Sequence, residues 1–214
     1  MQLISVNIGQ KRAIENATKS GFTGIYKLPI SVPVQVTLDG LAEDAICDTK
    51  NHGGPDQAVY IYGQPDYQWW SNTLGKELLP GTFGDNLTIS GLESASFCIG
   101  DRLQVGAVTL EVTAPRIPCG TLAARMGDPG FIKRFRAAER PGLYCRVIHA
   151  GWVQAGDEVS LEGYKGETVS ILEMFRDFYE PYRSEAQLRR YLASPLAIRA
   201  RQDKEEQLRM LFGV

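Results

Sequence analysis

The sequence predicts a mostly β domain with some helix, built as a closed or nearly closed barrel of mixed strands and followed by a small helical subdomain. Up to about residue 162 the chain holds many short segments in which apolar and polar residues alternate, as in half-buried strands. Turns rich in glycine and proline separate these segments. After residue 168 apolar residues recur at helical spacing. We therefore expect a barrel domain over residues 1–165 and a three-helix extension over residues 166–214.

In the first third of the chain the alternation predicts four strands: residues 3–8, 30–38, 45–47 and 58–62. Pro33 lies within the second of them and indicates an edge strand or a bulge, because proline has no N–H for the ladder. A turn is expected at residues 21–24. A helix is predicted over residues 65–74, with Asp66 near its start and Gly75 at its end.

Four further strands are predicted after this helix, at residues 87–89, 99–105, 107–113 and 142–149, and a strand pair is predicted within 151–161. The second and third form a hairpin around Gly106. Short helices are expected at residues 121–125 and 131–135. The extension is predicted to hold helices over residues 170–179, 184–192 and 203–212, and Ser184 followed by Gln187 is a helix-start signal.

Composition and charge exclude several classes of function. The formal net charge is −2 and no run of Lys and Arg occurs, so nucleic acid is not an expected partner. No apolar stretch has membrane-spanning length, and the first residues lack the features of a signal peptide. The four cysteines are widely spaced without a Cys-x-x-Cys pair, which argues against a zinc site. A cytoplasmic protein with reduced thiols is expected.

Cys119 is the first candidate for chemistry. Pro115 and Pro118 stiffen the segment before it, and good helix formers follow it. A thiol at the start of a helix meets free N–H groups that favour the thiolate, the form that attacks carbon or binds a soft metal. Arg116 and Arg125 can add positive charge. The alternative is a buried cysteine that only fills space.

A second candidate is the loop that contains His52, Gly53 and Gly54. Successive glycines let the backbone approach a ligand closely, and exposed N–H groups of such a loop can cradle an anion. His52 and Lys50 can supplement these groups. The alternative is a plain connection in which the glycines serve only the turn.

A third candidate is the loop that ends in Asp85 and Asn86, whose side chains can hydrogen-bond the edge of a heterocycle. Asp-Asn before a strand is also a common turn device. Asp44 and Asp48 precede the histidine loop and either hold its backbone or are solvated. Arg134 belongs to a basic helix face that is either solvated or a phosphate clamp.

Four segments occur in an informative order: HGGPDQAVY at residues 52–60, PGTFGDNL at 80–87, PRIPCGTL at 115–122 and GLYCRV at 142–147. Together they resemble the MOSC domain family (molybdenum cofactor sulfurase C-terminal domain) in its stand-alone, YiiM-like form. The region after residue 168 is similar to the three-helix extension of that form. Nearly the whole chain takes part in the resemblance, and the joint order of the segments carries it.

The resemblance implies a β-barrel that holds the molybdenum cofactor, molybdopterin, through one cysteine, here Cys119. Pyridoxal phosphate is not expected. The loops of His52 and of Asp85 with Asn86 would line the pocket. The pterin phosphate would meet N–H groups of the glycine-rich loops or the cations described above, whose residues are Arg116, Arg125 and Arg134. Some relatives carry Lys where this chain has Thr121, so other cations would have to serve.

The resemblance further implies reduction of N-hydroxylated compounds, such as N-hydroxylated purine bases, with electrons from a separate flavoprotein or iron–sulfur protein. The sequence has no flavin-type Gly-x-Gly-x-x-Gly and no cysteine cluster, in agreement with an outside donor. Such a protein would be a monomer or a homodimer. Two alternatives stay open: a non-catalytic carrier of cofactor or sulfur on Cys119, and a thiol-nucleophile enzyme that uses Cys119 with His52. A Ser-His-Asp hydrolase is not supported, because no Gly-x-Ser-x-Gly occurs.

Overall fold

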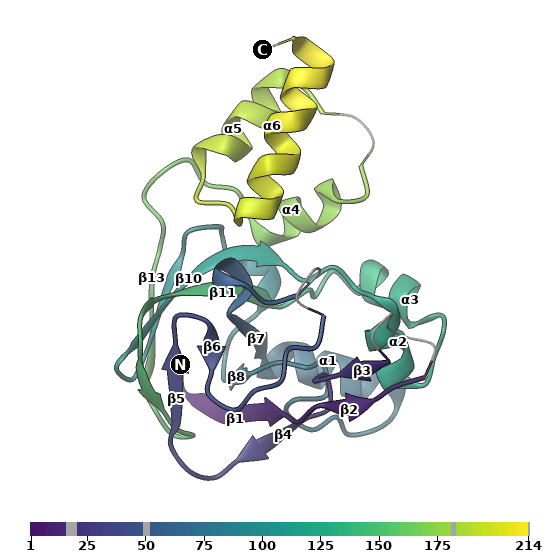
Figure 1. The fold of residues 1–214 in the computed structure, drawn as a ribbon, viewed down its shortest axis with the longest axis vertical. Coiled ribbons are helices and arrows are strands. Elements are labelled where there is room, and N and C mark those ends of the chain that lie inside the picture. The colour runs from purple at the N-terminus through teal and green to yellow at the C-terminus, as the bar shows by residue number, and fades with distance from the viewer. Residues whose placement is uncertain (16–20, 49–51, 181–182, 214) are drawn as a thin grey trace.

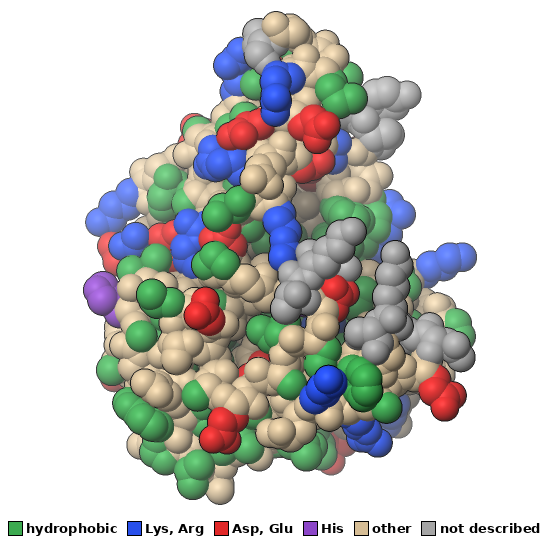
Figure 2. Space-filling model, in the orientation of Figure 1, with side chains coloured by type: hydrophobic (Ala, Val, Ile, Leu, Met, Phe, Trp, Pro, Cys, Tyr) green, Lys and Arg blue, Asp and Glu red, His purple; other side chains and the backbone are tan. Residues whose placement is uncertain are grey.

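The computed structural model describes residues 1–15, 21–48, 52–180 and 183–213. Figure 1 shows a curved sheet with helices beside it and, above these, the last three helices of the chain. The class is mixed α and β. No helix in the described ranges is long and apolar enough to cross a membrane. On the face drawn in Figure 2, acidic and basic side chains are interspersed.

The main sheet has eight strands, all antiparallel to their neighbours except for the parallel pair β7 and β8. Their order is β13 (Val159–Glu162), β9 (Arg102–Val105), β10 (Val108–Pro115), β11 (Leu143–His149), β7 (Val59–Gly63), β8 (Leu87–Ile89), β1 (Leu3–Gly9) and β4 (Lys27–Ile30). The predicted hairpin is confirmed, since β9 and β10 pair around Gly106, whose φ of 53° suits glycine. Buried apolar side chains from these strands form one continuous core.

The predicted closed barrel is not found in the described residues. The strand ladders leave β13 and β4 as the two edges of the sheet. An isolated bridge between Gln2 and Glu158 brings the chain just before β1 against the chain just before β13. The hydrogen-bond ladder of the main sheet is therefore not continuous from β13 back to β4. Three of the other strands form a second sheet instead.

That second sheet has three strands in the order β12 (Gly151–Val153), β5 (Val34–Thr37) and β6 (Gly40–Leu41). The single strand predicted over residues 30–38 was wrong. Residues up to Ile30 belong to β4 and those from Val34 onward to β5, with Pro33 in the break between the two sheets. Proline cannot donate to either ladder, which accounts for the break at this point.

Three further local predictions need correction. Residues 45–47 form no strand. β12 and β13 do not pair with each other, since β12 joins β5 and β13 joins β9. The turn expected at residues 21–24 contains β3 (Phe22–Thr23), which pairs with β2 (Arg12–Ala13). Hydrophobic alternation identifies a strand but carries no information about its partner.

Helices α1 (Gln64–Leu74), α2 (Gly120–Met126) and α3 (Phe131–Ala138) confirm the predicted helices of the first region. A second core, rich in aromatic rings, joins them: Trp70 lies 5.0 Å from Phe131 and 5.8 Å from Phe83 between ring centroids. Two short 3-10 helices, η1 (Pro55–Gln57) and η2 (Ser94–Ser96), lie in loops. This core fixes the start of α2, where Cys119 lies.

The C-terminal helices α4 (Ile171–Asp177), α5 (Glu185–Ala193) and α6 (Ile198–Phe212) confirm the predicted extension as three helices. Ser184 caps α5, because its hydroxyl accepts a hydrogen bond of 3.1 Å from Gln187 N. Buried side chains of α4, such as Ile171 and Met174, share the core of the main sheet. The division into two domains near residue 165 stays a prediction.

Candidate functional site

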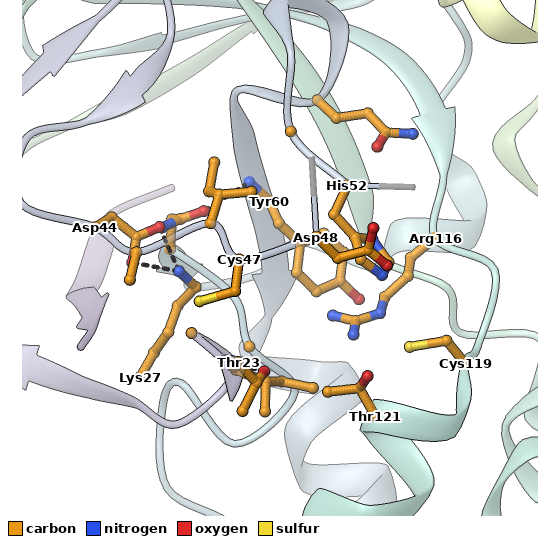
Figure 3. A pocket seen from close by; sticks show the side chains of 18 of the residues that line it. Thr23, Lys27, Asp44, Cys47, Asp48, His52, Tyr60, Arg116, Cys119 and Thr121 are labelled. Carbon is orange, nitrogen blue, oxygen red and sulfur yellow. Dashed lines mark hydrogen bonds and ion pairs between the residues drawn. The ribbon is translucent and has the colours of Figure 1, made fainter. Parts of the chain in front are cut away.

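A pocket opens beside the N-terminal end of α2 (Figure 3). It encloses about 650 Å³ of empty space, its open mouth included. Its walls come from segments far apart in the sequence, and the polar side chains that matter below are Lys27, Asp44, His52, Asn86, Arg116 and Cys119.

Cys119 is the N-cap residue of α2. Its extended backbone (φ −128°, ψ 170°) continues the segment that leaves β10, and its carbonyl accepts the first helical N–H groups, from Leu122 and Ala123. The thiol is half-buried, and Figure 3 shows the sulfur pointing into the pocket, toward Arg116. The predicted turn before a short helix is thus confirmed, and the cysteine is not a buried filler.

Burial alone would raise the pKa of the Cys119 thiol. A hydrogen bond from His52, the charge of Arg116 and the N–H of Leu122 outweigh that effect and lower the pKa to about 6. Each of these groups stabilises the thiolate. Most of the cysteine is therefore ionised at neutral pH, as a nucleophile or a soft metal ligand requires.

Arg116 is the buried cation of the pocket, with 4% of its surface exposed. Its Nη1 donates a hydrogen bond of 2.5 Å to Phe83 O, and its guanidinium lies over the ring of Tyr60, 4.9 Å from the centroid. Its Nε is buried and has no hydrogen-bond partner in the described part of the chain. An unpaired buried donor is unfavourable, so this nitrogen fits a pocket that receives an anionic group.

His52 comes from the glycine loop on another wall of the pocket. Its Nδ1 lies 3.5 Å from the hydroxyl of Tyr144. Gly53, at φ 72°, lines the pocket, and a Cβ there would lie 2.9 Å from Ile46 Cγ2. Glycine is thus required at position 53, because the backbone there packs closely against the side chain of Ile46. Gly54 lines a neighbouring cleft instead, and Lys50 lies outside the described residues.

The wall opposite Cys119 carries a buried ion pair between Lys27 and Asp44 (Figure 3). Asp44 also accepts hydrogen bonds of 2.8 Å from Gly9 N and from Asn86 Nδ2. Burial lowers the pKa of Lys27, and the carboxylate of Asp44 opposes that effect. Sequence reasoning missed Lys27, because no motif surrounds it, and left the role of Asp44 open between backbone support and solvation.

The structure separates Asp85 from Asn86. Asn86 lines the pocket, and its Oδ1 accepts a hydrogen bond of 3.1 Å from Tyr60 N. Asp85 is fully buried outside the pocket lining and accepts hydrogen bonds of 2.5 Å from Tyr67 and 2.7 Å from Thr88. Burial raises the pKa of Asp85, although these hydrogen bonds oppose it. Its position supports the pocket wall from behind rather than a ligand.

Two of the predicted cations do not line the pocket. The guanidinium of Arg125 lies over the ring of Tyr26, 4.7 Å from the centroid. Arg134 is exposed on α3 and pairs with Asp128 at 3.5 Å. The helical period placed Arg134 on an outward face but could not say what that face meets. Both side chains are near Cys119 in sequence and not in the cavity.

Besides Lys27, further pocket residues were not predicted as site residues, among them Cys47, Tyr144 and Thr121. Cys47 adds a second thiol to the pocket lining, and Tyr144 lies within the GLYCRV segment. In the described ranges no group of three or more His, Cys, Asp or Glu side chains is placed to hold a metal ion. Cys119 thus offers one thiolate, with a guanidinium and an imidazole beside it.

Comparison with known proteins agrees with these features. Residues 48–160 match the family described as the MOSC domain. YflK of Bacillus subtilis is 34% identical over 171 residues, which cover 79% of this chain and 77% of that protein. A protein named reductase from Gibberella moniliformis is 34% identical over 143 residues, 65% of this chain but 25% of that protein. The crystal structure of YiiM from Geobacillus stearothermophilus has a TM-score of 0.80 at 26% identity and covers 97% of this chain and 98% of that one.

Proposed function

This chain belongs to the MOSC domain family and is YiiM-like, and we propose that it is a molybdenum-cofactor reductase of N-hydroxylated compounds, such as N-hydroxylated purine bases. A separate flavoprotein or iron–sulfur protein supplies the electrons. The observation that carries the proposal is the Cys119 thiol, whose pKa of about 6 and position in a pocket suit a soft ligand to a bound cofactor. The name of the Gibberella protein supports the reaction class.

The residues of the pocket fit this cofactor. Cys119 would provide the thiolate ligand, and the unpartnered Nε of Arg116 would provide a buried donor for an anionic group. Lys27 and Arg116 are the cations of the pocket lining, so they replace Arg125 and Arg134 as the proposed contacts of the phosphate. The lack of a Cβ at Gly53 lets the loop pack against Ile46 at the pocket wall, and Asn86 fixes another part of the wall by accepting a hydrogen bond from Tyr60 N.

Reduction of an N-hydroxylated base breaks the N–O bond, takes up two electrons and two protons, and releases water and the amine. The bound cofactor supplies the two-electron chemistry. The chain supplies a group to hold the proton: His52 Nδ1 and the Tyr144 hydroxyl lie 3.5 Å apart at the pocket wall, and His52 is one of the groups that lower the pKa of Cys119. We propose His52 as the group that holds a proton near the substrate.

The test uses protein expressed with molybdate, an N-hydroxylated purine and a chemical electron donor. We expect near-stoichiometric molybdenum and turnover to the amine. Cys119→Ser should lose both, and Cys98→Ser, which changes a thiol outside the pocket lining, should keep both. Molybdenum retained by Cys119→Ser would reject the ligand assignment.

The same thiolate also suits a carrier that holds the cofactor or activated sulfur without turnover. The assay separates the two functions. A molybdenum-replete sample that reduces none of several N-hydroxylated compounds would favour the carrier.

A thiol-nucleophile enzyme is the other candidate. It is favoured because His52 lines the same pocket as Cys119 and lowers the pKa of its thiol, as a base beside a catalytic cysteine does. Covalent trapping of Cys119 by an electrophile in protein that binds no molybdenum would support this candidate. If bound molybdenum prevents the trapping, the thiol-nucleophile candidate is rejected, and turnover then separates the reductase from the carrier.

A further inference from the structure

Helix α6 of the extension begins without a cap of its own. Its N-cap residue, Ala197, has no polar side chain, yet the first helical N–H must be satisfied. The N–H of Ile198 donates a hydrogen bond of 2.6 Å to Asp56 Oδ2. Asp56 lies in η1, directly after the glycine loop of the pocket. Asp56, in the segment of residues 52–57 beside the pocket, therefore caps a helix whose first residue is 142 positions later in the chain.

Arg146 on β11 closes the same junction from the other side. Its Nε lies 2.9 Å from Asp56 Oδ1. Its Nη2 donates to the carbonyls of Pro195 and Leu196, at 3.2 and 3.0 Å. One guanidinium thus holds both the carboxylate of the pocket segment and the chain that leads into α6.

Two more contacts complete the junction. Thr113 Oγ1 donates a hydrogen bond of 2.5 Å to Asp56 O, and Thr113 O accepts one of 3.2 Å from Ala197 N. Arg199 Nη1 lies 3.5 Å from Gln57 Oε1, and Gln57 lines the pocket. The first turn of α6 therefore contacts Asp56 through the N–H of Ile198, and it contacts Gln57 of the pocket wall through Arg199.

The segment that carries His52 is held locally by backbone hydrogen bonds from His52 N to Asp48 O and from Gln57 N to Gly54 O, at 2.9 and 3.0 Å, with two glycines between them. Gly53 and Gly54 both have positive φ, at 72° and 80°, and no strand or α-helix includes them. Glycines in an irregular loop lose much conformational freedom when they are fixed, so an outside contact must hold them. Asp56, two residues after Gly54, is the point at which α6 and Arg146 provide that contact.

We propose that the C-terminal helices are a positioning element for the pocket: through Asp56 and Arg146, α6 holds residues 52–57 so that His52 faces Cys119. Asp56 and Arg146 are positioning residues and do not touch substrate. The inference rests on the proposed function only in taking this pocket as the functional site. It assigns the extension a task beyond covering the sheet.

Histidine NMR tests this, because the chain has only two histidines, His52 and His149. In cofactor-free, full-length protein labelled at histidine, two imidazole signals are expected, and His149→Gln assigns them. Ile198→Pro removes the N–H that donates a hydrogen bond to Asp56. Proline suits the first helical position, and Ala197 already has the extended backbone (φ −54°, ψ 140°) that precedes proline.

Ile198→Pro and Asp56→Ala should shift or broaden the His52 signal and leave the His149 signal unchanged. Ile198→Ala is the matched control, because it removes the same exposed side chain and keeps the N–H. Arg190→Ala is a second control, since it breaks an ion pair with Glu173 and a hydrogen bond to Thr168 O, both inside the extension and neither involving Asp56 or Arg146. Both controls should keep the His52 signal of the wild type.

An unchanged His52 signal in folded Ile198→Pro would overturn the inference, and Ile198→Pro decides alone if Asp56→Ala does not fold. A His52 signal that also moves in Ile198→Ala would overturn it, because the N–H contact would then not be the cause. Molybdenum content is measured separately. Wild-type protein without molybdenum but with the expected NMR changes would leave this inference standing and reject the proposed function.

Discussion

Cys119 and Cys145 are both cysteines, but they lie in different regions of the molecule, and the pKa values of their thiols are shifted in opposite directions. Cys145 lies within β11, fully buried opposite Val112 and Val59. Burial raises its pKa, and the nearby Glu111 raises it further. Burial also acts on Cys119, yet His52 and Arg116 lower its pKa to about 6. Burial alone therefore does not decide whether a cysteine is reactive.

The difference follows from where each cysteine lies along the chain. At Cys145 the backbone N–H groups are used by the ladder and the cross-strand neighbours Val112 and Val59 are apolar, so they do not stabilise a thiolate. Where β10 has ended and α2 begins, free N–H groups are available and two loops bring a histidine and an arginine to the sulfur. The ionised thiol therefore lies between two regular elements, after β10 and at the start of α2.

The largest expected effect is the contrast in reactivity between the two thiols. In cofactor-free protein at pH 7, iodoacetamide should alkylate Cys119 at least about 1,000-fold faster than Cys145, because one is mostly thiolate and the other is buried and neutral. Mass spectrometry of digested samples measures both rates. Comparable rates in folded protein would remove the contrast.

The second effect is on stability. The folded pKa of Cys119, about 6, lies below the ordinary value of 9.0, so the folded state favours the thiolate. That contribution is present at high pH and is lost as the pH falls through about 6. The free energy of unfolding of cofactor-free wild type minus that of Cys119→Ser should rise by roughly 2–3 kcal/mol from pH 6 to pH 8. A pH-independent difference in urea unfolding would contradict this.

The third effect isolates the charge of Arg116. Arg116→Gln should raise the midpoint of the pH–alkylation profile of Cys119 by about one unit, which slows alkylation at pH 6 by roughly fivefold. Arg116→Lys keeps a cation and should retain most of the low midpoint. If both variants shift the midpoint equally, the cause is packing rather than charge.

The smallest effect is expected at Arg134, which is exposed and outside the pocket. Arg134→Ala should change the free energy of unfolding by less than about 0.5 kcal/mol and leave the molybdenum content of purified protein unchanged. Loss of molybdenum in this variant would return Arg134 to the proposed cofactor contacts.

Much of the fold could be predicted from the sequence, because strands and helices follow local patterns. The hairpin around Gly106, the helix that ends at Gly75 and the three C-terminal helices are all found. Partner choice could not be predicted: the break at Pro33 sends β5 to another sheet, and β12 joins it there. A closed or nearly closed barrel was predicted because a count of strands does not show how many sheets they form.

The site could be predicted where chemistry and local structure coincide, as at Cys119, His52, Gly53, Asn86 and Arg116, which all line the pocket. Lys27 could not be predicted as a site residue. Its place in the pocket depends on the ion pair with Asp44, which is 17 residues away in sequence and meets it only in the folded chain. Arg125 and Arg134 show the opposite error, in which nearness in sequence was taken for nearness in space. Their roles depend on which way α2 and α3 face, and this is decided by the aromatic core.

Anomalous diffraction at the molybdenum edge, from crystals of protein produced with molybdate, tests the central claim most directly. The account predicts one strong peak within bonding distance of the Cys119 sulfur, inside the pocket beside Arg116. A peak bonded to Cys47 instead, a peak outside the pocket, or no peak from molybdate-supplied protein would contradict it.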